Sequence, residues 1–162
     1  AEISARKSLE LSKDNPYGIT VLGWTYLQKK QYQQALEVHE KLPKYYSAFK
    51  VILGYTYIQT GNKDKALALY SELEEESQQH WVSPLDRGML AGMMGYTDKA
   101  FELINEACDH HCFNTNYIDV YLPMAEFLKD DPRYSELFQK MNLPYKELIL
   151  ASKSTKNPDT SD

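Results

Sequence analysis

Residues 53–67, LGYTYIQTGNKDKAL, decide the fold. They place Gly54 twelve residues before Ala66, with a further glycine, Gly61, at a position suited to a turn between two helices. The same pair of markers recurs as Gly23 with Ala35 and as Gly88 with Ala100, and equivalent turn positions follow at Lys30 and Gly95. A repeat period of about 34 residues is typical of stacked helix-turn-helix units. The chain is therefore predicted to be an all-α solenoid.

The small residues have a direct physical role in such a unit. A small residue on each of two paired helices lets their backbones approach, and larger apolar residues then fill the seam. These larger residues recur at spacings of three, four and seven, which is a helical apolar face. They are Leu22, Tyr26, Leu36 and Leu42 in the first unit and Leu53, Tyr57, Leu67 and Leu73 in the second. Each helix pair leaves one face open, so the next pair is expected to cover it.

Helix start and stop signals agree with this division. Asn15-Pro16 and Ser83-Pro84 are typical of an N-cap followed by proline at the first helical position, and Asp86 completes a capping-box spacing. Gly61 and Gly95 suit left-handed residues at helix ends. Asp131-Pro132 and Pro144 are expected to open later helices. We predict helices over 2–13, 17–29, 32–42, 46–60, 63–78, 83–94, 97–109, 117–128, 132–141 and 144–151, followed by a disordered polar tail over 152–162.

The markers resemble the tetratricopeptide repeat family, whose pattern is Leu-Gly, a Tyr three residues later, a turn Gly, and then Ala, an aromatic residue and Ala. The matching residues are Leu22, Gly23, Tyr26, Tyr32, Ala35 and Leu42; then Leu53, Gly54, Tyr57, Gly61, Ala66, Tyr70 and Leu73; then Gly88, Gly95, Ala100, Ile104 and Ala107. The third unit departs most, with Arg87 in place of Leu and Ala91 in place of Tyr, so less regular packing is expected there.

The resemblance covers roughly residues 1–112 and implies a right-handed superhelical solenoid of about three helix-turn-helix repeats. We expect one domain over residues 1–151. Its parts are the end of a truncated repeat (1–13), three repeats (16–45, 47–80 and 81–112) and C-terminal capping helices (113–151). The absence of an initiating Met leads us to expect a piece of a longer protein or a processed chain.

A second resemblance lies downstream. FLKDDPRY at 127–134, LF at 137–138 and MNLP at 141–144 resemble the segment that ends repeat domains fused to bacterial regulators, including adenylate-cyclase-like and winged-helix transcriptional regulators. This resemblance implies that the chain is the C-terminal repeat domain of a larger regulatory or signalling protein, and that the segment closes the solenoid.

In the tetratricopeptide repeat family, the first helix of each pair lines a concave groove. By register, the groove residues are Tyr17, Thr20, Trp24 and Gln28; Ala48, Val51, Tyr55 and Gln59; and Val82, Leu85, Met89 and Met93. Trp24, Tyr55 and Met89 are equivalent, and an aromatic and methionine stripe suits an apolar or amphipathic peptide. The alternative is that residues 113–151, or another part of the same protein, cover the stripe.

One kind of partner is disfavoured by the same register. Family members that bind chaperone tails clamp a carboxylate with Lys and Asn at fixed groove positions. Here those positions hold Thr20, Val51 and Leu85, together with Trp24, Tyr55 and Met89. A carboxylate clamp is therefore not expected.

The cluster Cys108-Asp109-His110-His111-Cys112 contains zinc-competent ligands. A structural zinc site needs four ligands, usually as two separated pairs, and nothing in the sequence brings His39 or His80 near. Histidine also suits the last turn of a helix, and cysteine packs as a small apolar residue. We therefore expect neither a metal site nor a cofactor.

Charge and motifs exclude several other functions. The formal net charge of −5 disfavours nucleic acid, which requires a basic surface. No apolar run is long enough to span a membrane, and two cysteines four residues apart fit a reducing compartment such as the cytoplasm. No phosphate loop, nucleophile elbow or metal-binding His-Glu motif is present, so no enzymatic activity is expected.

The sequence thus predicts a non-catalytic scaffold for protein–protein interaction, whose partner is a protein, a peptide or another domain of the same protein. Two alternatives stay open. The domain can be a structural module that forms a homodimer through an exposed end face or the groove, or a repeat domain that senses a ligand. The residues name no ligand.

Overall fold

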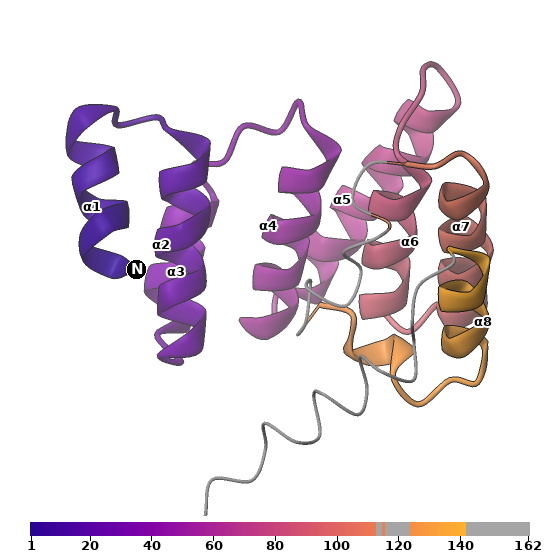
Figure 1. The fold of residues 1–162 in the computed structure, drawn as a ribbon. Coiled ribbons are helices and arrows are strands. Elements are labelled where there is room, and N and C mark those ends of the chain that lie inside the picture. The colour runs from indigo at the N-terminus through magenta and orange to yellow at the C-terminus, as the bar shows by residue number, and fades with distance from the viewer. Residues whose placement is uncertain (113–114, 116–123, 142–162) are drawn as a thin grey trace, which may run out of the picture.

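The computed structural model describes residues 1–112, 115 and 124–141, and all regular elements among these residues are helices. They are α1 (Glu2–Leu11), α2 (Pro16–Gln28), α3 (Tyr32–His39), α4 (Ser47–Gln59), α5 (Lys63–Ser77), α6 (Pro84–Met93), α7 (Thr97–Asp109), the 3-10 turn η2 (Glu126–Leu128) and α8 (Arg133–Lys140). The all-α solenoid predicted from the repeat markers is confirmed (Figure 1).

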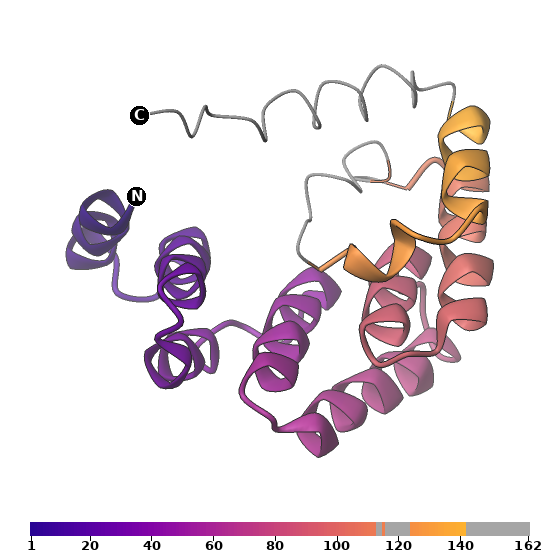
Figure 2. The same ribbon diagram turned by 90° about the horizontal axis from the view of Figure 1, so that it is seen from below.

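The helices follow one another along an arc. Figure 2 shows α2, α4 and α6 on the inner side of the arc and α3, α5 and α7 on the outer side. The pairs α2–α3, α4–α5 and α6–α7 pack against each other, and α4 also packs against α6 of the next pair. No helix among the described residues is long and apolar enough to cross a membrane.

The helix boundaries follow the predicted signals closely. The Asn15 side chain accepts hydrogen bonds from the backbone N–H groups of Tyr17 and Gly18, and the Ser83 hydroxyl accepts one from the N–H of Asp86. The three turn positions have positive φ, at 58° for Lys30, 78° for Gly61 and 93° for Gly95. The N-cap and turn predictions are therefore confirmed, whereas the Asp86 carboxylate accepts from the Ser47 hydroxyl of α4 instead of completing a capping box.

The repeated glycine makes room for a different neighbour in each unit. A Cβ on Gly23 would lie 2.0 Å from the imidazole of His39, and a Cβ on Gly54 would lie 2.6 Å from Leu90 of the next unit. Only in the third unit does the glycine, Gly88, face the backbone of its paired helix, where a Cβ would lie 3.1 Å from the Ala100 carbonyl oxygen. The same marker thus supports three different contacts.

Two basic residues form ion pairs between neighbouring helices. The ammonium group of Lys50 on α4 is 2% exposed and donates to Glu72 at 2.9 Å and to Glu76 at 2.6 Å, both on α5. Burial lowers the pKa of Lys50, but the two glutamates outweigh burial and leave it raised. Arg87, which replaces the expected Leu, donates two hydrogen bonds to Glu74 of α5 at 2.7 and 3.0 Å.

The C-terminal elements pack on the last helix pair. Arg133 of α8 pairs with Asp98 at 2.9 Å and lies 4.2 Å from the centre of the Phe101 ring, while Lys140 pairs with Asp109 at 2.7 Å. The predicted helix over 117–128 is a 3-10 turn at 126–128, and residues 117–123 lie outside the described part. The predicted helix at 144–151 and tail at 152–162 lie outside it as well. The predicted seam residue Leu67 is half-exposed.

Candidate binding groove

The structure brings most of the predicted groove residues to one side of the arc. Four of them belong to a single buried apolar cluster, and two more pack against its edge. The buried residues are Val51, Tyr55, Leu85 and Met89, and those at the edge are Trp24 and Met93. Of the remaining residues, Thr20 is half-buried and Val82 is buried in the other apolar cluster, and the exposed ones are Tyr17, Gln28, Ala48 and Gln59.

Part of the predicted groove is core in the structure. Met124, Ala125 and Leu128, on and beside η2, belong to the same cluster as Leu85 and Met89. Figure 2 shows η2 on the inner side of the arc beside α6. Val51, Leu85 and Met89 are consequently no more than 4% exposed, and we do not assign them to binding. The α6 part of the groove is filled by the chain's own segment, because its apolar side chains gain more from burial there than from exposure to water.

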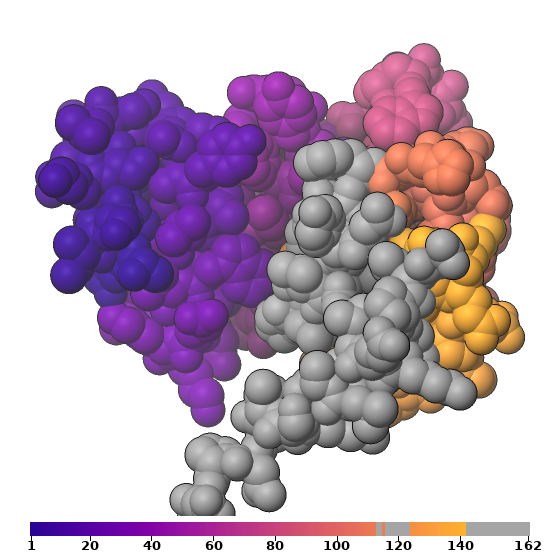
Figure 3. Space-filling model, in the orientation of Figure 1, coloured from indigo at the N-terminus to yellow at the C-terminus, as the bar shows by residue number. Residues whose placement is uncertain are grey.

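The groove residues of α2 and α4 meet in a stacked pair of rings. The rings of Trp24 and Tyr55 stack with their centres 5.3 Å apart and their planes 29° from parallel. Offset stacking of this kind adds to the free energy gained by burial. The space-filling view shows α1 and α2 at one end of the molecule, in indigo, where the later helices do not cover them (Figure 3). This stacked pair therefore connects the core to an accessible surface.

A buried histidine lies directly beside the stacked pair. The His39 ring is 6.4 Å from that of Trp24, edge to face, and is fully buried. Its Nδ1 lies 2.7 Å from the Thr56 hydroxyl of α4, and its Nε2 lies 3.3 Å from the Thr20 carbonyl oxygen of α2. The Thr20 carbonyl oxygen can only accept, and the Thr56 hydroxyl also lies 3.0 Å from the Ile52 carbonyl oxygen, so its one proton goes either to Ile52 or to the His39 ring. Burial lowers the pKa of His39 to about 4, so the ring is neutral at pH 7.

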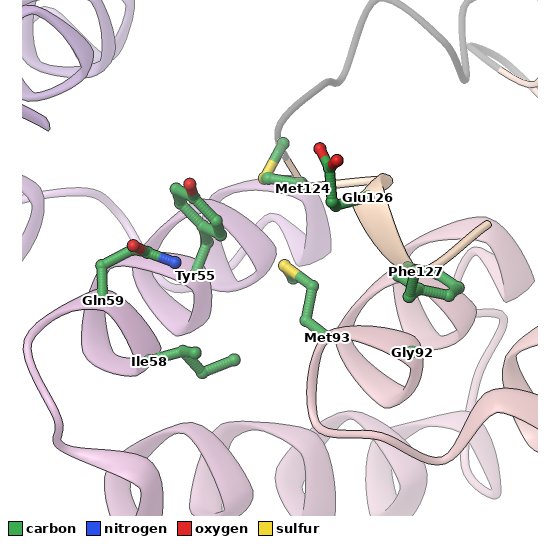
Figure 4. Close-up of a pocket in the computed structure, with 8 residues that line it drawn as sticks. All are labelled: Tyr55, Ile58, Gln59, Gly92, Met93, Met124, Glu126 and Phe127. Atoms are coloured by element: carbon green, nitrogen blue, oxygen red, sulfur yellow. The ribbon is translucent and has the colours of Figure 1, made fainter. Parts of the chain in front are cut away.

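A pocket of about 220 Å³ lies where α4, α6 and η2 meet. It is lined by Tyr55, Ile58, Gln59, Gly92, Met93, Met124, Glu126 and Phe127, and we call it the α4–η2 pocket. Figure 4 shows Tyr55 and Gln59 on one side, Met124 and Glu126 on the other, and the Met93 side chain between them. Burial raises the pKa of Tyr55, and the negative charge of Glu126 adds to the increase.

The position of η2 depends on a glycine. A Cβ on Gly92 would lie 2.1 Å from the Phe127 ring, so only glycine lets this ring rest against α6. Sequence reasoning identified neither Gly92 nor the pocket residues Ile58, Glu126 and Phe127 as site residues. The signal for Gly92 was a glycine one turn after the repeat marker Gly88, where the repeat pattern does not require one.

Two of the three inner helices, α2 and α4, carry almost no charge, whereas α6 carries Asp86 and Arg87. The α2 sequence, PYGITVLGWTYLQ, contains no Asp, Glu, Lys or Arg, and the one charged residue of α4 is the buried Lys50. An occupant of this surface would gain little from carrying many charges, because a charge removed from water without a partner is costly. The surface therefore suits apolar and uncharged polar groups.

The cysteine cluster has the character of a helix end. Cys108 and Cys112 are buried free thiols within the main apolar cluster, and burial raises the pKa of both. The raised pKa keeps both as neutral thiols, the form that binds metal least. Among residues 1–112, 115 and 124–141, no three histidine, cysteine or acidic side chains are grouped to hold a metal ion.

The helix pair α4–α5 matches a known repeat family. Residues 49–80 match the tetratricopeptide repeat. The match covers almost all of α4 and the whole of α5, the helix pair whose sequence contains the deciding stretch 53–67. It supports a tetratricopeptide repeat assignment, consistent with the all-helical solenoid, and such repeats generally mediate protein–protein interaction as scaffolds without catalytic activity. No curated protein and no solved structure matches the chain.

Proposed function

We propose that this chain is a non-catalytic protein-interaction domain that binds an apolar or amphipathic segment of a partner protein over α2 and α4. The observation that carries the proposal is the Trp24–Tyr55 stack at the edge of the core, next to the exposed side chains of Tyr17, Gln28 and Gln59. Tryptophan and tyrosine contribute most of the binding energy in many interfaces. The amide groups of the two glutamines can pair with the backbone of an extended segment.

The proposal includes the wider setting that the sequence resemblance implies. The domain would act in the cytoplasm as the C-terminal repeat domain of a larger bacterial regulatory or signalling protein, either for a separate protein or for another domain of the same chain. The near absence of charge on α2 and α4 supports an apolar occupant over nucleic acid, which needs a basic surface.

Replacing Trp24 by Ala tests the groove. Peptides would be selected from a random display library with the unaltered chain, and their dissociation constants then measured by isothermal titration. We expect Trp24→Ala to weaken binding about 30-fold, because a central tryptophan contributes about 2 kcal/mol or more. Tyr55 is a poorer choice for substitution, because its side chain is buried in the core and its loss would disturb packing.

The matched control is Trp81→Ala. Trp81 is 69% exposed between α5 and α6, so the same substitution there removes an exposed indole without reaching the groove. Both variants would first be compared with the parent by circular dichroism. The groove is not the binding site if the two variants weaken the selected peptides equally, or if a folded Trp24→Ala variant binds as tightly as the parent.

Self-association is a second candidate, because α1 carries exposed apolar residues. The side chains of Ile3 and Leu11 are each 83% exposed, and the outer face of an end helix in a repeat array has no neighbouring repeat to cover it. Light scattering after gel filtration would show a mass that rises with concentration in the parent and falls to that of a monomer in an Ile3→Ser/Leu11→Ser variant. A mass of one chain at every concentration excludes this candidate.

A further inference from the structure

Three of the side chains that line the α4–η2 pocket are polar. Tyr55, Gln59 and Glu126 line it, and Glu126 supplies the only formal charge among its lining residues. Within the described part of the chain, the Tyr55 hydroxyl and the Gln59 amide have no hydrogen-bond partner, and Glu126 is paired only through Oε2, to Lys129. These groups can therefore accept hydrogen bonds from a ligand.

The size of the pocket limits its occupant. Pockets for small-molecule ligands are usually about 300–1,000 Å³, whereas this one is about 220 Å³. A single side chain projecting from a segment bound in the groove fits this volume better than a complete small-molecule ligand. The pocket also adjoins the groove through Tyr55, which stacks on Trp24 and lines the pocket as well.

The walls favour a particular kind of side chain. Ile58, Met93, Met124 and Phe127 provide aliphatic, thioether and aromatic surface, which suits a hydrocarbon stem. The Glu126 carboxylate is 67% exposed and already paired with Lys129, and a cationic tip can take the place of that partner whereas an apolar tip cannot. A chain that is apolar along its length and positively charged at its tip satisfies both the walls and the carboxylate.

We infer that the α4–η2 pocket binds the lysine side chain of the partner segment, with its stem against Met93 and Met124 and its ammonium group donating to Glu126. This inference rests on the proposed function of the groove. Lysine fits better than arginine, because an ammonium group is a compact charge on an unbranched stem, whereas guanidinium is a larger planar group. The bound ammonium competes with Lys129, whose Nζ now lies 2.8 Å from Glu126 Oε2.

The competition with Lys129 makes the inference testable with two exposed residues. Glu126 is 67% exposed at its side chain and Lys129 is 37% exposed, so each can be replaced without altering the core. Glu126→Gln removes the charge and keeps the shape of the acceptor. Lys129→Met removes the competing cation and keeps a similar stem. The two substitutions should change affinity for a lysine probe in opposite directions.

The experiment uses the full chain labelled with carbon-13 at its five methionine methyl groups. Nα-acetyl-lysine methylamide is titrated and followed by nuclear magnetic resonance, and Nα-acetyl-norleucine methylamide serves as the neutral probe with the same stem. We expect the lysine probe to shift the methyl signals of Met93 and Met124 but not that of Met94, which packs in the other apolar cluster. Its affinity should exceed that of the norleucine probe about tenfold.

The two variants then show whether the charge or the hydrocarbon stem of the lysine probe determines its binding. Glu126→Gln should abolish the preference for lysine, and Lys129→Met should tighten binding of the lysine probe. Equal affinities for the two probes, or signals that move equally at Met93, Met94 and Met124, would overturn the inference. Peptides that depend on Trp24 but contain no lysine would overturn the pocket assignment while leaving the groove in place. A probe that binds while no peptide depends on Trp24 would overturn the groove alone.

Discussion

Replacing Gly23 by Ala is expected to destabilise the domain by about 3 kcal/mol, although alanine is the better helix former. The added methyl group would lie 2.0 Å from Nε2 and 2.2 Å from Cδ2 of His39. The ring has no room to retreat, because it is fully buried and lies between Thr20 of α2 and Thr56 of α4. Moving it breaks both contacts and disturbs the joint between the first two repeats. Urea unfolding followed by circular dichroism measures the loss.

Two comparisons isolate the cause of this loss. Gly18→Ala lies in the same helix, and its methyl group would meet the flexible end of Leu9 at 3.1 Å, so its stability should stay within about 1 kcal/mol of the parent. In a His39→Ala background the ring is absent, and Gly23→Ala should then cost little further stability. If Gly23→Ala is as costly in that background as in the parent, contact with the imidazole is not the cause.

Acidification from pH 6.5 to pH 4 is expected to remove about 3 kcal/mol of stability through His39 alone. Burial lowers the pKa of His39 from 6.5 to about 4 in the folded chain. Below pH 6.5 the unfolded chain therefore gains a proton at this residue that the folded chain does not gain until about pH 4. The free energy of unfolding falls over this window by up to about 1.4 kcal/mol per pH unit. Urea unfolding at half-unit steps of pH measures it.

His39→Gln should flatten this pH dependence, since the amide does not titrate, whereas His80→Gln on the exposed surface should leave it unchanged. Other groups act differently over the same range. Hydrogen bonds to Lys29 and Arg133 lower the pKa of Glu2 and Asp131, so their contributions are lost only near and below pH 4.5. Burial raises the pKa of Asp86, which favours the folded chain at low pH. These contributions are the same in the parent and in His39→Gln, so they cancel when the two proteins are compared. If the free energy of unfolding depends on pH equally in both, the assignment of the effect to His39 is contradicted.

The fold was largely predictable from local signals. Caps such as Asn15 and Ser83 and the turn positions Gly61 and Gly95 determine the local backbone through contacts within a few residues, so the sequence reveals them directly. The stack of Trp24 on Tyr55 follows from repeat register, because equivalent positions on successive first helices lie side by side. Periodicity therefore identified Trp24 and Tyr55 as equivalent positions, and the structure shows that their rings stack.

The remaining part of the groove depended on contacts that have no period. Phe127 reaches α6 from a segment 35 residues beyond Gly92, outside the repeats, so register could not place it there. His39 also escaped prediction, since its partners Thr20 and Thr56 come from two other helices and neither residue belongs to the repeat pattern. Tertiary packing determined the positions of Phe127 and His39. It also buried Val51, Leu85 and Met89, which were expected to line an open groove.

The contact between Trp24 and His39 also gives the protein an optical reporter. The chain contains two tryptophans, and Trp81→Phe would leave the indole of Trp24 as the single long-wavelength emitter. Indole fluorescence shifts to shorter wavelength when water is excluded and is quenched by a protonated imidazole nearby. Emission from such a variant would therefore register a segment settling over α2 as a change of colour, and the charging of His39 as a loss of intensity. Binding of a segment and protonation of His39 could therefore be followed separately in one sample, without an attached dye.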